Sequence, residues 1–202
     1  MLCLRAATDE AWAREAIEDL DAVLVDHAHC EMKAATNALS LVVRHPGDLA
    51  LVRALTAIAQ EELAHFDRVV ELIGKRGLAL GVPPIDDYAA QLRRAMNALP
   101  ASDLPLVTNR LLVGALIEAR SCERFKLLLG AMPESTPAEL RAFYQELFEC
   151  EAKHYREYVD LAKRSAGSLA HLVEARLDLL AEAEARIVRA LPQNDARGSV
   201  HG

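Results

Sequence analysis

The sequence predicts an all-α protein built from four long helices with two or three accessory helices. The chain is 52% hydrophobic but only 4% aromatic, and it holds just 9 Gly and 8 Pro in 202 residues. Such a mixture, dominated by Ala, Leu, Glu and Arg, favours helices over strands. Apolar residues recur with helical spacing between short breaks, and no segment alternates as a strand would. A chain of this length fits one domain, expected here over residues 1–191.

The first helical stretch can be capped by Thr8 and Asp9, and it runs to the break "RHPGD". It divides into two helices if the denser apolar pattern from Leu20 starts a new one. A second long helix follows and ends at Gly77. The segment "GLALGVPPI" is expected to be a loop because its Gly and Pro residues disfavour a helix, and Asp86 then enters a short helix.

The second half of the chain predicts two further long helices and a final amphipathic one. The third long helix begins after residue 102 or 103, and "GAMPESTP" ends it. Thr136 is expected to cap the fourth, with Pro137 at its first position and Glu139 as capping-box partner. Residues 192–202 are typical of a disordered tail. The expected helices cover about residues 9–43, 49–76, 86–99, 103–129, 137–165 and 168–191.

Charge and cysteine usage exclude several classes of protein. The net charge of −7 argues against a broadly basic nucleic-acid binder, so any RNA contact needs a local basic patch. No apolar run reaches the length of a membrane span, and the N-terminus lacks the pattern of a signal peptide. The four cysteines form no CxxC pair, which favours a reducing, cytoplasmic location.

An internal repeat relates the second and fourth long helices. "EELAHFDRVVELIGKRG" aligns with "CEAKHYREYVDLAKRSAG", so Glu62 and His65 match Glu151 and His154 at an offset of 89 residues. A Glu-x-x-His pair places two potential metal ligands on one face of a helix. The pair alone is a weak signal, but a chance pair would not bring its aligned neighbours with it.

The first and third long helices repeat in the same way. "LVDHAHCEMK" aligns with "LIEARSCERF" at an offset of 92 residues, which sets Glu31 against Glu123 and Asp26 against Glu118. One helical hairpin has therefore been used twice. Together the repeats supply one carboxylate from each of two helices and a Glu-x-x-His from each of the other two, the ligand set of a bundle that holds two iron or manganese ions. The candidate ligands are Glu31, Glu62, His65, Glu123, Glu151 and His154.

The third-helix ligand has an alternative. Glu118 and Glu123 are five residues apart, about 140° around a helix, so both cannot point equally at one centre. We prefer Glu123 and interpret Asp26 and Glu118 as acceptors that orient the ligand imidazoles, or else as ordinary surface acids. His27 lies four residues before Glu31 and is a weaker candidate for a role at the metal site.

Three cysteines immediately precede proposed ligands. Cys30, Cys122 and Cys150 each lie about 100° around the helix from the neighbouring glutamate. A buried cysteine usually packs as a small apolar residue, so we expect these thiols to wall the site and not to bind metal.

The segments "DHAHCEMKAA", "EELAHF", "LLVGALIEARSCERF" and "EAKHYREY" resemble a known family. It is that of the tRNA 2-methylthio-N6-isopentenyladenosine hydroxylases, which are ferritin-like non-haem di-iron monooxygenases. The resemblance covers about residues 10–185, and "GALIEARSCERF" is its most specific part. It implies a ferritin-like four-helix bundle with accessory helices and the same six ligands, including Glu123.

The resemblance also implies the reaction and its participants. Two iron ions would activate dioxygen as co-substrate, and one oxygen atom would enter the isopentenyl side chain of a hypermodified adenosine next to the anticodon. An external electron donor, an unidentified reductase, would supply the electrons. The expected partner is tRNA carrying prenylated adenosine, with the protein a monomer or dimer and no membrane contact. Candidate phosphate contacts are the basic clusters Lys75–Arg76, Arg93–Arg94, Arg120–Arg124–Lys126 and Lys163–Arg164.

Two other functions compete with this one. A rubrerythrin-like di-iron peroxidase or an iron-oxidising ferritin-like protein would use the same ligands, although rubrerythrins normally bring a CxxC-based iron site that this sequence lacks. A metal-free helical interaction module is the second alternative. The two aligned Glu-x-x-His pairs count against it, because burying six polar ligands without a metal is costly.

Overall fold

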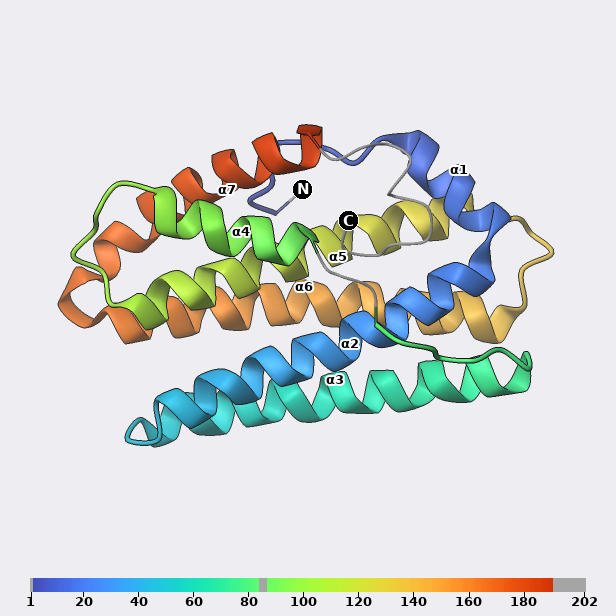
Figure 1. Ribbon diagram of the computed structural model, residues 1–202, viewed down its shortest axis with the longest axis horizontal. Coiled ribbons are helices and arrows are strands. Elements are labelled where there is room, and N and C mark those ends of the chain that lie inside the picture. The colour runs from blue at the N-terminus through green and yellow to red at the C-terminus, as the bar shows by residue number, and fades with distance from the viewer. Residues whose placement is uncertain (1, 84–86, 191–202) are drawn as a thin grey trace. The chain divides into compact units, whose positions relative to one another are not determined.

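The computed structural model describes residues 2–83 and 87–190. Every regular element within these ranges is helical, with seven α-helices and one 3-10 helix (Figure 1). This confirms the all-α prediction. The expected helix start at Asp86 and the expected disordered tail at residues 192–202 lie outside the described residues.

The described chain separates into two compact units. One contains residues 18–83, and the other contains residues 2–17 and 87–190. The expected single domain over residues 1–191 therefore stays a prediction. Each unit is built around one of the two helical hairpins that the internal repeat predicts.

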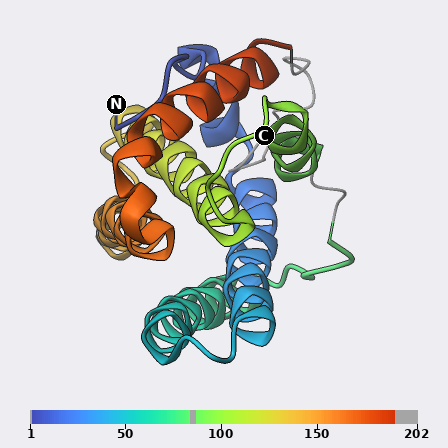
Figure 2. The same cartoon turned by 90° about the vertical axis from the view of Figure 1, so that its left-hand side faces the viewer.

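The first hairpin consists of α2 (Leu20–Arg44) and α3 (Leu49–Lys75), which pack side by side in both ribbon views (Figures 1 and 2). Each helix begins at an aspartate, because Asp19 and Asp48 accept hydrogen bonds from backbone N–H groups of the first turn. α1 (Glu10–Glu18) is a separate helix that ends just before Asp19. Of the two readings of the first helical stretch, the division near residue 20 is confirmed.

The second hairpin consists of α5 (Leu106–Ala131) and α6 (Ala138–Ala166). Pro105 and Pro137 occupy the N-cap positions, and neither helix has a side-chain cap. The predicted cap at Thr136 and its capping box with Glu139 are therefore wrong. Pro137 has an extended backbone, which places the start of α6 one residue later than the capping pattern requires. The third long helix likewise begins later than expected, at Leu106.

Accessory helices pack on the second hairpin. α4 (Asp87–Ala98) and α7 (Val173–Ala190) contact each other and α5. The predicted last helix begins as a 3-10 turn, η1 (Gly167–Leu172), before it becomes α7. α1 is tied to α5, since the guanidinium of Arg124 lies 5.1 Å from the ring centre of Trp12.

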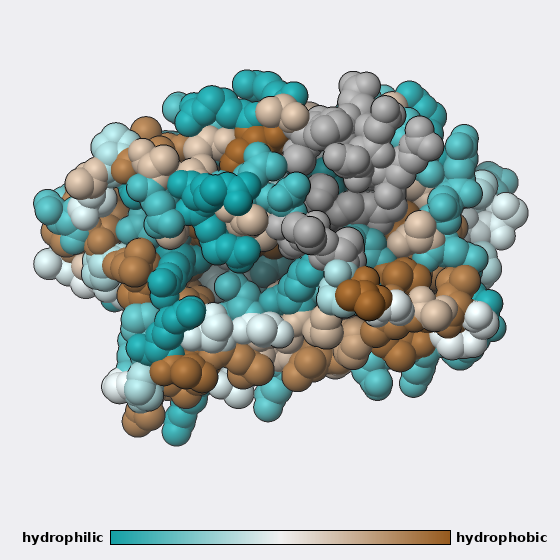
Figure 3. Space-filling view, in the orientation of Figure 1, coloured by the Kyte–Doolittle hydropathy of each residue, from teal (hydrophilic) through white to brown (hydrophobic). Residues whose placement is uncertain are grey.

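The surface of the α2–α3 hairpin carries several exposed apolar side chains. Figure 3 shows brown, apolar residues along the lower edge, where Figure 1 places α3. Isolated exposed residues of this kind are ordinary on folded proteins. Among the described helices, none is long and apolar enough to cross a membrane. The exposed apolar residues of this hairpin include Leu39, Val43, Leu49 and Leu63.

Candidate metal centre

The α2–α3 hairpin brings together three of the predicted ligands, here called the α2–α3 set: Glu31, Glu62 and His65. All three are buried, and one ligand atom from each lies within 4.8 Å of the others. His65 Nδ1 is 3.7 Å from Glu31 Oε2 and 3.6 Å from Glu62 Oε2. Two atoms that bind one ion at about 2.1 Å each lie roughly 3–4 Å apart. The spacing of the set therefore fits a metal ion.

Glu31 is held by a histidine of its own helix. His27 Nε2 lies 2.6 Å from Glu31 Oε1, and both side chains are almost fully buried. Burial by itself would raise the pKa of Glu31, but the hydrogen bonds from His27 and His65 outweigh burial and hold that pKa well below its usual value. Glu31 therefore stays a carboxylate, the form that binds metal.

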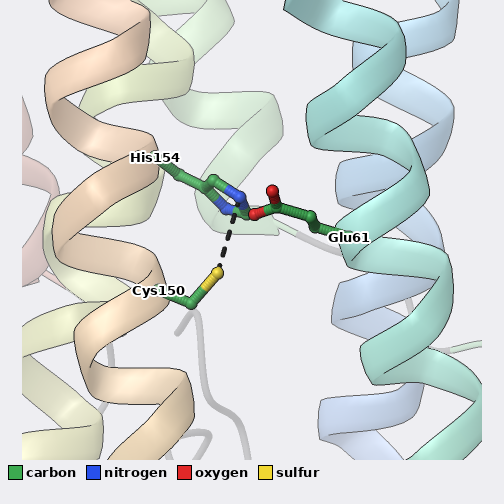
Figure 4. A group of neighbouring side chains, drawn as sticks. All are labelled: Glu61, Cys150 and His154. Carbon is green, nitrogen blue, oxygen red and sulfur yellow. Dashed lines mark hydrogen bonds between the residues drawn. The ribbon is translucent and has the colours of Figure 1, made fainter.

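The α5–α6 hairpin contains a matching trio, here called the α5–α6 set: Glu118, Glu151 and His154. All three are buried, and a carboxylate oxygen of Glu118 lies within 4.8 Å of a ring nitrogen of His154. Figure 4 shows His154 and Cys150 on one face of α6, and it also draws Glu61, which precedes Glu62 on α3. The Cys150 sulfur is 3.6 Å from His154 Nε2. The thiol thus contacts the ligand imidazole, and its expected place in the wall of the site stays a prediction.

Glu123, which the sequence favours as the third-helix ligand, forms hydrogen bonds and an ion pair with other residues. Its carboxylate accepts hydrogen bonds from the backbone N–H and the hydroxyl of Thr8, the latter at 2.8 Å, and it pairs with the guanidinium of Arg120. A carboxylate held by these donors has its charge compensated without a metal. Glu118 is buried, and one of its carboxylate oxygens lies within 4.8 Å of a ring nitrogen of His154, so it is the candidate carried into the proposal below. The ligand role of Glu123 stays a prediction.

Arg120 is the centre of a buried polar network. Its guanidinium is fully buried and donates to Glu184 at 2.7 Å, to Thr8 at 3.0 Å and to the carbonyl of Ala6 at 3.0 Å. The hydroxyl of Tyr88 donates to the same Glu184 oxygen. The network joins α4, α5, α7 and the N-terminal segment, and sequence reasoning missed it. The only signal was the excess of charged residues in an otherwise apolar stretch of α5.

The donor chemistry of the two sets suits iron or manganese. Each set offers two carboxylates and one imidazole, an oxygen-rich combination that favours these ions over a closed tetrahedral zinc site. Two carboxylates buried together are costly without a compensating cation, and a divalent ion removes that cost. The residues present therefore fit the predicted metal.

The remaining candidates near the ligands have structural partners. The thiol of Cys30 donates to Asp26 Oδ2 at 3.5 Å, and that of Cys122 donates to the carbonyl of Phe148 at 3.6 Å. Burial raises the pKa of Cys122 to about 11, so its thiol stays protonated at neutral pH. The predicted role of Asp26 in orienting a ligand imidazole stays a prediction.

Burial decides which basic clusters can reach RNA. Arg120 and Arg124 are buried and cannot contact a phosphate backbone. Arg76 is bound to Asp21 at 2.5 Å and Lys163 to Glu174 at 3.0 Å. Arg93 and Arg94 of α4 are exposed and, within the described ranges, make no ion pair. Of the predicted clusters, this arginine pair is the one most available to a partner.

Comparison with known proteins decides the family. The model of the tRNA-(MS[2]IO[6]A)-hydroxylase (MiaE) family matches residues 1–199. The chain belongs to this family. A curated MiaE-family relative, the tRNA 2-(methylsulfanyl)-N(6)-isopentenyladenosine(37) hydroxylase of Pseudomonas putida, is 40% identical over 159 residues, which cover 79% of this chain and 74% of the relative. The hydroxylase of the same name from Salmonella typhimurium is 27% identical over 235 residues, covering 92% and 83%.

A solved structure supports the fold. "Protein 43 with aldehyde deformylating oxygenase activity from Synechococcus" is similar to this MiaE-family chain with a TM-score of 0.86 and 34% identity, covering 100% of this chain and 96% of the other. This likeness confirms the predicted ferritin-like fold class. It also adds a second oxygenase to the relatives of the chain.

Proposed function

We propose that this MiaE-family chain is an iron-dependent monooxygenase that hydroxylates the isopentenyl side chain of a hypermodified adenosine in tRNA. The match of the family model to residues 1–199 carries the assignment. The two buried carboxylate–histidine sets support it, because both have the donors of a metal site and the α2–α3 set also has the spacing.

The proposed ligands of two iron ions are three residues from each hairpin. The bound irons would supply the chemistry that activates dioxygen. Glu31 is already ionised and held by His27, and each Glu-x-x-His pair fixes an oxygen and a nitrogen on one helical face. Glu31 thus needs no deprotonation before metal binds. The six are Glu31, Glu62, His65, Glu118, Glu151 and His154.

The balance of the reaction requires a reductant. One atom of dioxygen enters a C–H bond of the prenyl group and the other leaves as water, which takes two electrons and two protons. The sequence contains no CxxC pair that could hold an electron-entry iron site, and we propose that a separate reductase delivers the electrons.

A second candidate activity follows from the solved relative. A protein with aldehyde deformylating oxygenase activity shares the fold at 34% identity. Aldehydes with an alkyl chain and a prenylated nucleoside both offer an apolar group to an oxygenase. An aldehyde is therefore the substrate against which the tRNA assignment should be tested.

The test is a product assay with iron-reconstituted protein. We would supply tRNA bearing prenylated adenosine, with hydrogen peroxide in place of dioxygen and the two electrons of the reductant, and digest the tRNA to nucleosides for mass spectrometry. A gain of one oxygen on the prenylated nucleoside is expected. It should be lost in Glu151→Ala and retained in Glu149→Ala, which removes an exposed carboxylate two residues away on α6.

Two results would overturn the assignment. An unchanged nucleoside together with conversion of a long-chain aldehyde would favour the second activity. An unchanged nucleoside together with rapid peroxide consumption and full iron loading would favour a rubrerythrin-like peroxidase.

A further inference from the structure

We propose that His27 is a positioning residue that fixes the carboxylate of Glu31 for metal binding. The proposal rests on the di-iron function proposed above. It assigns a role to a buried histidine outside the six ligands.

The geometry shows which group donates. His27 Nε2 lies 2.6 Å from Glu31 Oε1, and the two residues are four apart on α2. An ionised carboxylate only accepts hydrogen bonds, so the proton is on His27 Nε2. A neutral imidazole in this tautomer is sufficient, and the role needs no change of charge.

The hydrogen bond leaves one carboxylate oxygen for the metal. His27 engages Oε1 of Glu31, while Oε2 lies 3.7 Å from His65 Nδ1 within the α2–α3 set. A carboxylate anchored by one oxygen cannot rotate freely, so the other oxygen keeps its direction. His27 is itself fully buried, which restricts its ring.

The other hairpin has no histidine at the corresponding position. The residue four positions before Glu118 is Gly114, and the ring of Tyr158 lies over it, since an added Cβ there would be 2.9 Å from Tyr158 Cε1. We therefore expect the two metal sites to differ, with only the site of the α2–α3 set dependent on a histidine of this kind.

The test measures iron binding to the purified full-length chain under anaerobic conditions. Iron(II) affinity is obtained by competition with a chelator, and Mössbauer spectra of the loaded protein report the two sites separately. His27→Leu removes the donor and keeps bulk. His27→Asn places an amide nitrogen near the position of Nδ1, and His27→Gln places one near the position of Nε2.

We expect His27→Leu and His27→Asn to lower the affinity of one iron by about 10- to 100-fold and to change one Mössbauer signal. His27→Gln should restore most of the affinity, because its amide N–H can reach Glu31. The matched control is His29→Leu, which removes a buried histidine that contacts the carbonyl of Leu80 at 2.9 Å. It should lower the melting temperature and leave iron affinity unchanged.

The results that would overturn this proposal can be distinguished from those that would overturn the proposed function. Unchanged affinity in His27→Leu would make His27 a core residue only. Failure of His27→Gln to restore binding, with spectra showing one imidazole fewer, would make His27 a direct ligand. A wild-type chain that binds no iron would remove the proposed function itself, whereas a wild-type chain that binds iron but leaves tRNA unchanged would not affect this test.

Discussion

Glu118 and Glu123 show how a single residue's role depends on its neighbours in space. Both are buried glutamates of α5, five residues apart. Thr8 and Arg120 compensate the charge of Glu123, whereas Glu118 lies beside His154. Sequence alignment within the repeat cannot distinguish these two environments, because the donors that hold Glu123 come partly from a segment more than a hundred residues away.

Replacement of either glutamate by glutamine separates the two roles. Glu118→Gln should lower bound iron by about one ion per chain, because it removes a charged ligand from a site that holds two. Glu123→Gln should leave iron content unchanged and destabilise the fold by about 1–3 kcal/mol, because it weakens buried hydrogen bonds. Metal analysis and urea unfolding of both variants provide the check. Iron loss in Glu123→Gln alone would restore the original assignment.

Gly114 is required by close packing. A Cβ at this position would lie 2.9–3.2 Å from the ring of Tyr158, which is almost fully buried. Gly114→Ala should therefore destabilise the protein by about 1–3 kcal/mol. Gly130→Ala, in the same helix but with nothing within 4 Å of the added Cβ, should be neutral or stabilise by up to about 1 kcal/mol. Chemical unfolding of the pair measures the difference, and equal effects would contradict this packing argument.

At the scale of elements, buried charge connects the helices of the larger unit. Arg120 of α5 pairs with Glu184 of α7 and with Glu123, and it also binds the backbone ahead of α1. Burial raises the pKa of Glu184, and the positive charge of Arg120 opposes that rise. The charge balance of Glu123 and Glu184 in this network therefore depends on Arg120.

Arg120→Met should destabilise the fold by about 3–5 kcal/mol, because two carboxylates lose their buried cation. The loss should grow as pH rises from about 5 to 8. Without Arg120 the pKa of Glu184 in the folded protein rises further above its value in the unfolded chain. The folded protein then loses stability as the pH rises through this folded-state pKa, because the buried carboxyl group must ionise without a cation beside it. Urea unfolding across this pH range is the measurement. Arg186→Met, an exposed arginine of α7, should change stability by less than about 0.5 kcal/mol at each pH.

Helix ends show where local rules succeed and fail. Asp19 and Asp48 cap α2 and α3 through their side chains, as aspartates at such positions are expected to do. α5 and α6 instead begin directly after prolines, without a side-chain cap. At Thr136 the capping pattern competes with the extended backbone of Pro137, and the proline determines the start of the helix.

At the scale of the whole molecule, the acidic chain must bind a polyanion. With a net charge of −7, binding has to rely on a few exposed cations. Arg93 and Arg94 meet this condition, whereas Arg76 and Lys163 are engaged by acidic residues. RNA affinity should therefore depend strongly on salt and on the arginine pair of α4.

Arg93→Ala combined with Arg94→Ala should weaken tRNA binding and reduce the slope of log affinity against log salt by about 1–2, because up to two phosphate contacts are lost. Iron content should not change. The comparison variant combines Arg76→Ala with Lys163→Ala. It removes the same formal charge, but from two side chains that already form ion pairs, so its effect on tRNA affinity and on the salt dependence should be smaller. Filter binding across a range of salt concentrations tests both, and a larger effect in the comparison variant would place the RNA on a different face.

The sequence by itself determined the helical fold class, the duplicated hairpin and five of the six ligands now proposed. It could do so because helical periodicity and a Glu-x-x-His pair are local patterns, and the repeat made each copy evidence for the other. The family resemblance, carried by the same segments, is confirmed by the match over residues 1–199. Helix boundaries near Thr136 and the start of α5 were less certain, because competing local signals overlap there.

Only the tertiary structure showed that Glu118 lies beside His154 while Glu123 pairs with Arg120, that the buried His27 contacts Glu31, and which arginines are removed from the surface. Each of these depends on distance and burial between residues that are not neighbours in the chain. A buried carboxylate that already pairs with a guanidinium needs no metal to compensate its charge, whereas one without such a cation does. That condition is set by the packing of Thr8, Arg120 and His154 around α5, which a linear pattern does not contain.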